Sequence, residues 1–327
     1  MPRRSIFTAQ ERENLFAIPS SQDELIRYYT LSESDLSLIN QHRGPANRLG
    51  FAVQLSLMHH PGIVLGVNEQ IHPVFLNFIA NQIGVSTDYW KEYGQRDETR
   101  REHLIELQTH FNFSQFSTRN YRPAIHRIEV VALQSDKGIL VAEALIKHIR
   151  SQSLLLPSIM VIERICSEAI TRSNRKIYTI LTELLSDEHK EKLDSILEKK
   201  NDSTITFLTW LRQSPAAPNA KHLLEHLDRL RYLRTIQLPE NIQSKVNNSR
   251  LMKIAREGCQ MTASNLSKFE PQRRYATLAA IVLETTATTI DEIINLHDRI
   301  VGSVFNRAKH KHTQKFQEAG KDINQKI

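Results

Sequence analysis

The segment 117–127 carries the side chains best suited to chemistry with a nucleic acid. A helix predicted from Ser117 or Thr118 would begin there, and the first turns of a recognition helix are the ones that reach base edges. Arginine and asparagine hydrogen-bond guanine and adenine in the major groove. A solvated polar helix start explains the same residues equally well. The candidates are Arg119, Asn120, Tyr121, Arg122 and Arg127.

A second predicted helix precedes this one. Helices over 96–110 and 118–135, joined by 111–117, resemble a helix-turn-helix with a long connection. The first of them contributes Arg96, Arg100 and Arg101 as candidates for DNA contact. A helix predicted over 45–60 is apolar around its circumference and indicates a core helix. The residues at its start, Arg43, Asn47 and Arg48, could still contact phosphate.

Further basic residues cluster along helices in the second half of the chain. Basic side chains near a helix C-terminus often only offset the helix dipole, so each cluster alone is a weak signal. Together the clusters fit an extended duplex footprint better than a small-molecule site. They comprise Arg172, Arg175, Lys176, Arg229, Arg231, Arg234, Arg273 and Arg274.

The string 222–226 matches the H-x-x-E-H pattern of inverted zinc peptidases. On a helix His222 and His226 share a face, where they could bind zinc while Glu225 acts as a base. The polar side of an ordinary amphipathic helix produces the same string, and no third ligand is evident in the sequence. We favour the structural interpretation and find no positive support for an enzyme in this sequence.

Glycine is scarce, with 10 residues in 327, about 3% against a usual ~7%. Glycine supplies the backbone conformations of tight hairpins and phosphate-binding loops, so its scarcity disfavours strand-rich and nucleotide-binding proteins. The net charge of +7 is modest for this length. Residues 1–200 hold 24 basic and 24 acidic side chains, so the whole excess lies in the remainder of the chain.

Apolar residues recur with helical spacing along nearly the whole chain, which predicts an all-α, multi-helical fold. Capping boxes are predicted at Thr8, Ser21 and Thr289. The β-branched run 285–289 predicts a break or kink in the last helical segment. The predicted helices are 8–17, 22–29, 33–42, 45–60, 73–83, 96–110, 118–135, 138–153, 158–185, 187–199, 204–212, 219–236, 240–258 and 272–316.

The two cysteines, Cys166 and Cys259, match no metal-ligand spacing and predict buried thiols in a reducing compartment. No apolar run is long enough for a signal peptide or a membrane span. We therefore expect a cytoplasmic protein with no membrane partner and no small-molecule substrate.

Six strings carry a resemblance to a known family. They are PRRSI (2–6), RGPANRLGFAVQL (43–55), YGQR (93–96), TRREHL (99–104), WLRQSP (210–215) and FEPQRRYATL (269–278). With them the chain resembles, from its first residue to its last, the N-terminal part of transposases of the Tn-three family, the replicative class II transposons of bacteria. One small departure is Cys259, where we expect glycine in relatives.

The resemblance implies that the chain binds the terminal inverted repeats of a transposon through helical domains. It also implies that cutting and joining belong to a later RNase-H-like domain with an Asp-Asp-Glu metal site. No carboxylate of this sequence maps onto that triad, so we expect neither catalysis nor a cofactor in this chain. A divalent metal is expected only in the catalytic domain.

We therefore predict a DNA-binding domain over 1–154, a second over 155–270, and a long helical linker or dimerisation segment over 271–327. The expected partner is double-stranded DNA at transposon ends, in the bacterial cytoplasm. The alternative function is a helical interaction scaffold that forms a homodimer without direct DNA readout.

Overall fold

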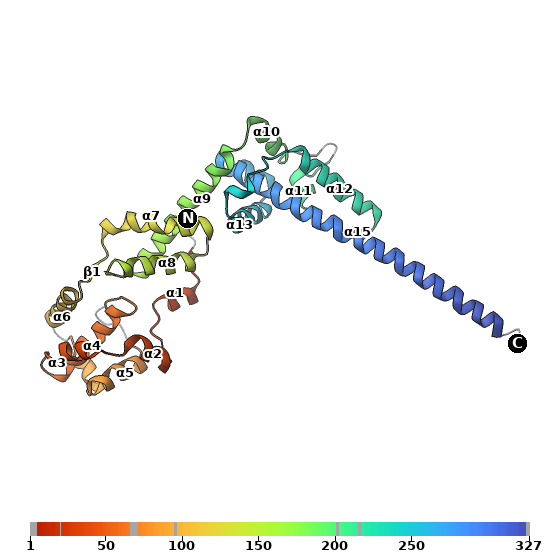
Figure 1. Cartoon of the computed structure of the whole chain (residues 1–327). Helices are drawn as coiled ribbons and strands as arrows, with labels where there is room; N and C mark the ends of the chain where they lie inside the picture. The colour runs from red at the N-terminus through yellow and green to blue at the C-terminus, as the bar shows by residue number, and fades with distance from the viewer. Residues whose placement is uncertain are drawn as a thin grey trace. The chain divides into compact units, whose positions relative to one another are not determined.

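The computed structural model of the chain describes residues 5–19, 21–65, 71–94, 97–200, 203–214 and 217–324. Helices make up almost all of its regular structure, which confirms the all-α class (Figure 1). The chain divides into two compact units, Met1–Ser173 and Asn174–Ile327. The three-domain division at 154/155 and 270/271 stays a prediction.

The first unit is built around two hydrophobic clusters. One surrounds α4, in which every residue from Leu49 to Met58 is buried, so the predicted core helix over 45–60 is confirmed. The other joins α7, α8 and the start of α9. The elements of this unit are α1 (Ala9–Leu15), α2 (Gln22–Tyr29), α3 (Glu33–Asn40), α4 (Pro45–His59), α5 (Pro73–Ile83), η1 (Thr87–Glu92), α6 (Asp97–His110), β1 (Ser114–Gln115), α7 (Thr118–Gln134), α8 (Gly138–Ser151), β2 (Leu154–Leu155) and the first part of α9 (Ile159–Glu183).

The two strands form a short parallel pair that the sequence did not predict. Ser114 pairs with Leu154 and Gln115 with Leu155. This pairing ties the segment before α7 to the segment after α8, and those two helices pack against each other. The pair therefore fixes both ends of a helical hairpin.

The second unit packs its helices against the first half of one long helix, α15 (Figure 1). Ala276 and the run from Leu278 to Val282 of α15 are buried, because α10, α12 and α13 cover them. The elements of this unit are the rest of α9, α10 (Asp187–Ser195), α11 (Phe207–Leu211), α12 (Ala220–Thr235), η2 (Gln243–Lys245), α13 (Asn248–Cys259), α14 (Ala263–Ser267) and α15 (Pro271–Asn324).

The predicted break at 285–289 is wrong, because α15 runs without interruption from Pro271 to Asn324. The hydroxyl of Thr286 donates to the carbonyl of Val282 at 2.6 Å, and that of Thr288 donates to the carbonyl of Glu284 at 2.9 Å. Thr289 is buried in the helix interior rather than placed at a cap. Local hydrogen bonding and tertiary packing outweigh the weak helix propensity of threonine here.

The other two capping predictions have different outcomes. Thr8 and Glu11 form the predicted capping box at the start of α1. Ser21 does precede α2, but its hydroxyl bonds the Glu24 carboxylate and not a backbone amide.

Among the described residues, no helix is both long and apolar enough to cross a membrane.

Candidate nucleic-acid interface

The start of α7 presents its basic side chains to solvent. Ala124, Ile125 and Ile128 bury one face of the helix in the second cluster, so the opposite face points outward. Arg119, Arg122 and Arg127 are exposed on that outer side. Within the part of the chain that the structure describes, none of these three arginines forms an ion pair, so their charges are available to a polyanion.

Asn120 and Tyr121 are more constrained than their arginine neighbours. The Asn120 Oδ1 accepts from the Ser117 N–H and from its hydroxyl, both at 2.9 Å, and thereby caps α7. The Tyr121 hydroxyl donates to Glu168 at 3.2 Å, and the same carboxylate pairs with Arg172 at 2.6 Å. These contacts assign a structural role to Asn120, Tyr121 and Arg172, whatever DNA contacts they make.

The predicted helix-turn-helix pair is not a packed pair. Leu107 of α6 belongs to the cluster around α4, whereas α7 belongs to the cluster with α8 and α9. The guanidinium of Arg100 lies 5.9 Å from the centre of the Tyr93 ring, and Arg101 is exposed. Arg96 lies outside the described residues. The helix that accompanies α7 is therefore α8.

The start of α4 carries another set of candidates. Gly44 precedes the helix with a φ of 84°, a left-handed conformation suited to glycine, and Pro45 opens the first turn. Arg43 is exposed here, while Asn47 is half-buried and donates to the Arg43 carbonyl at 3.1 Å. Arg48 is half-buried. Arg43 is thus the best exposed of the three.

The basic residues of the second unit divide into exposed and internal groups. Arg175, Lys176 and Arg234 are exposed, and Arg231 is exposed but paired with Asp228 at 3.0 Å. Arg229 is only 4% exposed and donates to the backbone carbonyl of Gln213, a position that a duplex would not reach. Burial lowers the pKa of Arg229 from its usual value.

Arg273 and Arg274 open α15 and are half-buried. The Arg273 guanidinium lies 3.9 Å from the centre of the Phe269 ring. Arg274 pairs with Asp194 at 3.1 Å, which ties the start of α15 to α10. Both arginines thus contribute to the packing of the second unit.

The H-x-x-E-H string has a structural explanation. His226 is 1% exposed; its Nδ1 donates to the carbonyl of His222 at 2.8 Å, and its Nε2 lies 3.2 Å from a Glu292 carboxylate oxygen. His222 instead contacts Glu225 at 3.0 Å. Both nitrogens of His226 therefore have protein partners. The described residues contain no group of three or more His, Cys, Asp or Glu suited to a metal.

Sequence reasoning missed the residues that α8 adds beside α7. Two adjacent hollows of about 410 and 250 Å³ lie between the helices and share His148. We call them together the α7–α8 groove. Its polar lining includes Asn120 and Arg127 from α7, and Lys147, His148 and Gln152 from α8 or the residue after it. No carboxylate appears among the described residues that line it.

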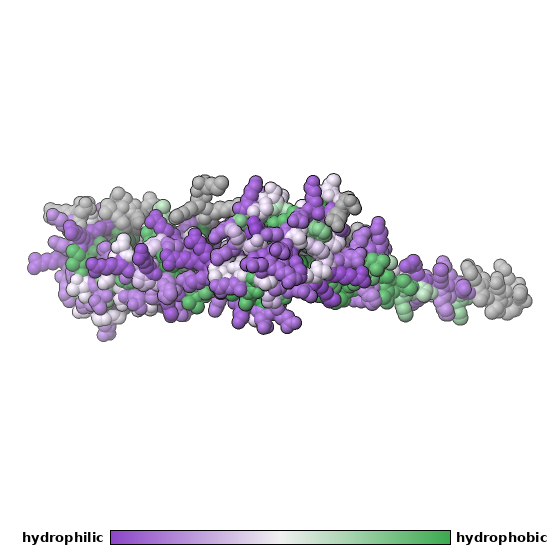
Figure 2. All heavy atoms as spheres, turned by 90° about the horizontal axis from the view of Figure 1, so that it is seen from above, coloured by the Kyte–Doolittle hydropathy of each residue, from purple (hydrophilic) through white to green (hydrophobic). Residues whose placement is uncertain are grey.

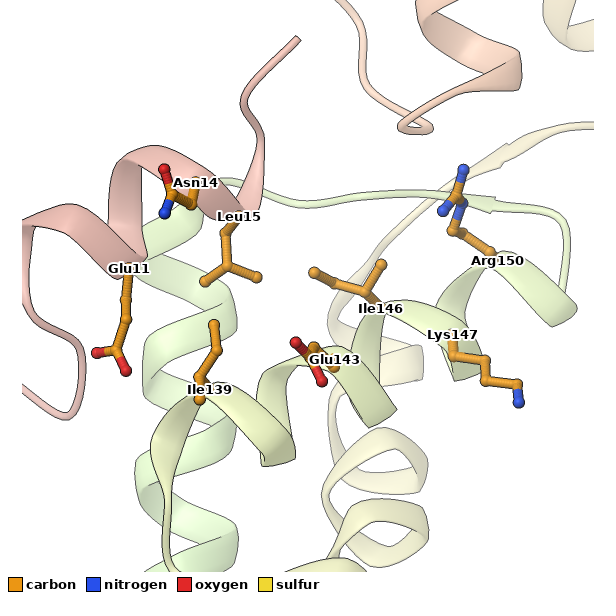
Figure 3. Close-up of a pocket in the computed structure, with 8 residues that line it drawn as sticks. All are labelled: Glu11, Asn14, Leu15, Ile139, Glu143, Ile146, Lys147 and Arg150. Atoms are coloured by element: carbon orange, nitrogen blue, oxygen red, sulfur yellow. The ribbon is translucent and has the colours of Figure 1, made fainter. Parts of the chain in front are cut away.

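The other side of α8 forms a pocket of different character (Figure 3). Its volume is about 650 Å³, and the side chains of Leu15, Ile139 and Ile146 point into it from α1 and α8. Glu11 and Glu143 also line it together with Lys147 and Arg150, so its charges balance, whereas the α7–α8 groove has basic side chains and, among its described lining residues, no carboxylate. Of the two faces of α8, the one toward α7 is therefore the better match to DNA.

The chain is similar in sequence to transposases of bacterial transposons. The chain is 54% identical over its whole length to the transposase for transposon Tn3926 and to that for transposon Tn21, both from Escherichia coli. It is 51% identical to the transposase for transposon Tn501 from Pseudomonas aeruginosa. It covers 33% of each of these proteins, so it spans about a third of their length.

A domain of unknown function, DUF4158, matches residues 6–169, half of the chain. The chain belongs to this family. The resemblance to the N-terminal region of Tn-three-type transposases is confirmed by these matches. The matched family segment contains the start of α4, the whole of α7 and the α7–α8 groove.

Proposed function

We propose that this chain binds the terminal inverted repeats of a bacterial transposon, as the non-catalytic region of a replicative transposase in the cytoplasm. The observation that carries the proposal is the match along the whole chain to transposases at 51–54% identity. The exposed arginines at the start of α7 support it, since the first turns of a groove-binding helix provide base contacts.

Cutting and joining DNA are assigned in this proposal to a domain outside the chain. The resembled family uses an Asp-Asp-Glu metal site for that chemistry, and none of the residues discussed above corresponds to it. Binding of the transposon ends then requires only cationic and hydrogen-bonding side chains, with no cofactor.

A gel shift with a duplex carrying an end of transposon Tn3926 tests the proposal against a scrambled duplex of the same length. We expect tighter binding to the end by at least about tenfold, because specific complexes are stabilised by base contacts as well as phosphate contacts. Arg119→Gln should reduce this preference, whereas Lys91→Gln, at another exposed position, should leave it unchanged. Equal affinity of the wild-type chain for both duplexes would remove sequence-specific recognition.

Self-association is a second candidate function, favoured by one observation on α15. Beyond the part covered by α12 and α13, this helix exposes Val301, Val304, Phe305 and Phe316, between 51% and 77% each. Figure 2 shows hydrophobic residues among hydrophilic ones along this part of α15. A second copy of the chain would bury such a surface.

Analytical ultracentrifugation over a range of concentrations tests this second candidate. We expect a dimer that weakens when Val301 and Phe305 are both changed to serine. Ile26, an exposed apolar residue of α2, provides the control as Ile26→Ser. A wild-type chain that stays monomeric at all concentrations would exclude self-association as the function of this segment.

A further inference from the structure

The α7–α8 groove differs in its charge from two other pockets of the first unit, one of which has both carboxylates and basic side chains and the other, among the described residues, no charged side chain. Arg127 lies on one wall, and Lys147 and His148 lie on the other. The floor is apolar, with Val131 and Ala144. Cationic walls over an apolar floor suit a sugar-phosphate backbone, in which charged phosphates alternate with less polar sugars.

We propose that the α7–α8 groove holds the backbone of one strand of a DNA duplex, with Lys147 and His148 as phosphate contacts beside Arg127. This inference rests on the proposed function and assigns to α8 a role that the sequence did not indicate. The start of α7 then faces the bases. The phosphate contacts from α8 hold the neighbouring strand and thereby fix the position of α7 on the duplex.

The length of the groove fits this occupant. Residues from Asn120 to Val131 of α7 line it, eleven residues apart, which corresponds to about 16 Å along the helix. The groove is therefore long enough for a short stretch of one DNA strand.

The helix dipole offers another explanation for His148, which lies in the last turn of α8. It does not account for Arg127, which lies in the middle of α7 and reaches the same groove. Charge complementarity to a polyanion explains the placement of both Arg127 and His148 in this groove.

The double variant Lys147→Gln/His148→Gln tests the inference by fluorescence anisotropy between 50 and 200 mM salt. Two probes are needed: a duplex carrying a Tn3926 end and its scrambled counterpart. We expect affinity to fall by about tenfold for both duplexes, and the slope of log affinity against log salt to become shallower by about one unit. Phosphate contacts are common to all sequences, so the two losses should be equal.

The control variant Lys91→Gln/His72→Gln removes the same residue types from exposed positions of the same unit. It should keep the wild-type affinity and slope. Lys147→Arg, which retains the charge, should keep the slope, and thermal melting establishes that each variant is folded. If the double variant melts early, Lys147→Gln alone decides the question, because Lys147 is exposed.

Three results would overturn the inference while the proposed function stands. They are wild-type binding of the transposon end with an unchanged double variant, a loss confined to the transposon end, and a loss shared equally by the control. Failure of the wild-type chain to bind the transposon end would instead contradict the proposed function itself.

Discussion

The type and position of Asn120 fit two roles, a contact with a DNA base and a cap at the start of α7. Its amide would suit adenine, yet its carbonyl oxygen already accepts two hydrogen bonds from Ser117. Bidentate recognition of adenine requires both the donor and the acceptor of the amide. The cap therefore competes with base contact at this position.

Replacement of Asn120 by alanine or by aspartate separates the cap from the rest of the side chain. Asn120→Ala should lower the free energy of unfolding by about 1 kcal/mol, because the two hydrogen bonds at the start of α7 are lost. Asn120→Asp should retain the stability, since a carboxylate accepts the same bonds and suits the helix N-terminus. Thermal melting of the two variants measures the difference; equal losses would contradict the capping role.

His103 makes the stability of the first unit depend on pH. It is 5% exposed, packed beside His42 and 3.3 Å from the Tyr93 hydroxyl. Burial, and then the neighbouring His42, lower the pKa of His103 to about 4. The unfolded chain therefore binds a proton near pH 6.5 that the folded chain takes up only near pH 4.

The contribution of His103 to the free energy of unfolding should thus be fully present above about pH 6.5 and should decrease as the pH is lowered toward 4. The expected loss from His103 between pH 7.5 and pH 5 is about 2 kcal/mol. Urea unfolding at the two pH values measures it, and His103→Gln should show a smaller difference than the wild-type chain. An identical pH difference in the variant would assign the effect to other groups.

At the scale of elements, the packing of α13 on α15 depends on one glycine. A Cβ at Gly258 would lie 2.5 Å from the Thr277 side chain and 2.9 Å from that of Ile281. Gly258→Ala should therefore destabilise the second unit by about 1–3 kcal/mol through overpacking.

Gly302 supplies the matched control on α15 itself. Nothing lies within 4 Å of a Cβ built there, and the residue is helical. Gly302→Ala should stabilise the helix by about 0.5–1 kcal/mol, because alanine loses less conformational entropy on folding. Denaturant unfolding of both variants tests the pair, and the same sign of change in both would contradict this packing.

The helices themselves were largely predictable, because apolar spacing and caps are local signals. The boundaries of α7 and the burial of α4 followed from them. Short elements such as α14 and the β1–β2 pair have too few residues to produce a periodic pattern. The threonines of α15 misled the prediction because burial and hydroxyl bonds to the preceding turn override propensity.

The candidate site was predictable only in part. Arg119, Arg122 and Arg127 belong to one helix, so their common exposure follows from its periodicity. The contribution of Lys147 and His148 depends on which helix packs beside α7, which no local pattern specifies. Arg229 did carry a signal, because it falls on the same helical face as Leu230 and Leu233.

For the whole molecule, which matches about a third of the length of each relative, the proposed function assigns only DNA binding to this chain. Binding of transposon ends through lysine and arginine side chains should need no metal ion. We therefore expect the gel shift with a Tn3926 end to be unchanged after dialysis against EDTA, with the ionic strength held constant. Loss of the shift in EDTA, with recovery on adding magnesium, would require a metal in the interface.

The continuity of α15 has a geometric consequence for anything attached along it. With 54 residues at 1.5 Å each, the helix is about 80 Å long and each residue turns it by about 100°. Deleting a single residue after Gly302 would rotate the Phe316 side of the helix by that angle relative to the buried face at Leu296. Deleting seven would shorten it by about 10 Å and nearly restore the original direction. The uninterrupted helix therefore fixes both the distance and the rotation between its buried part and its exposed end.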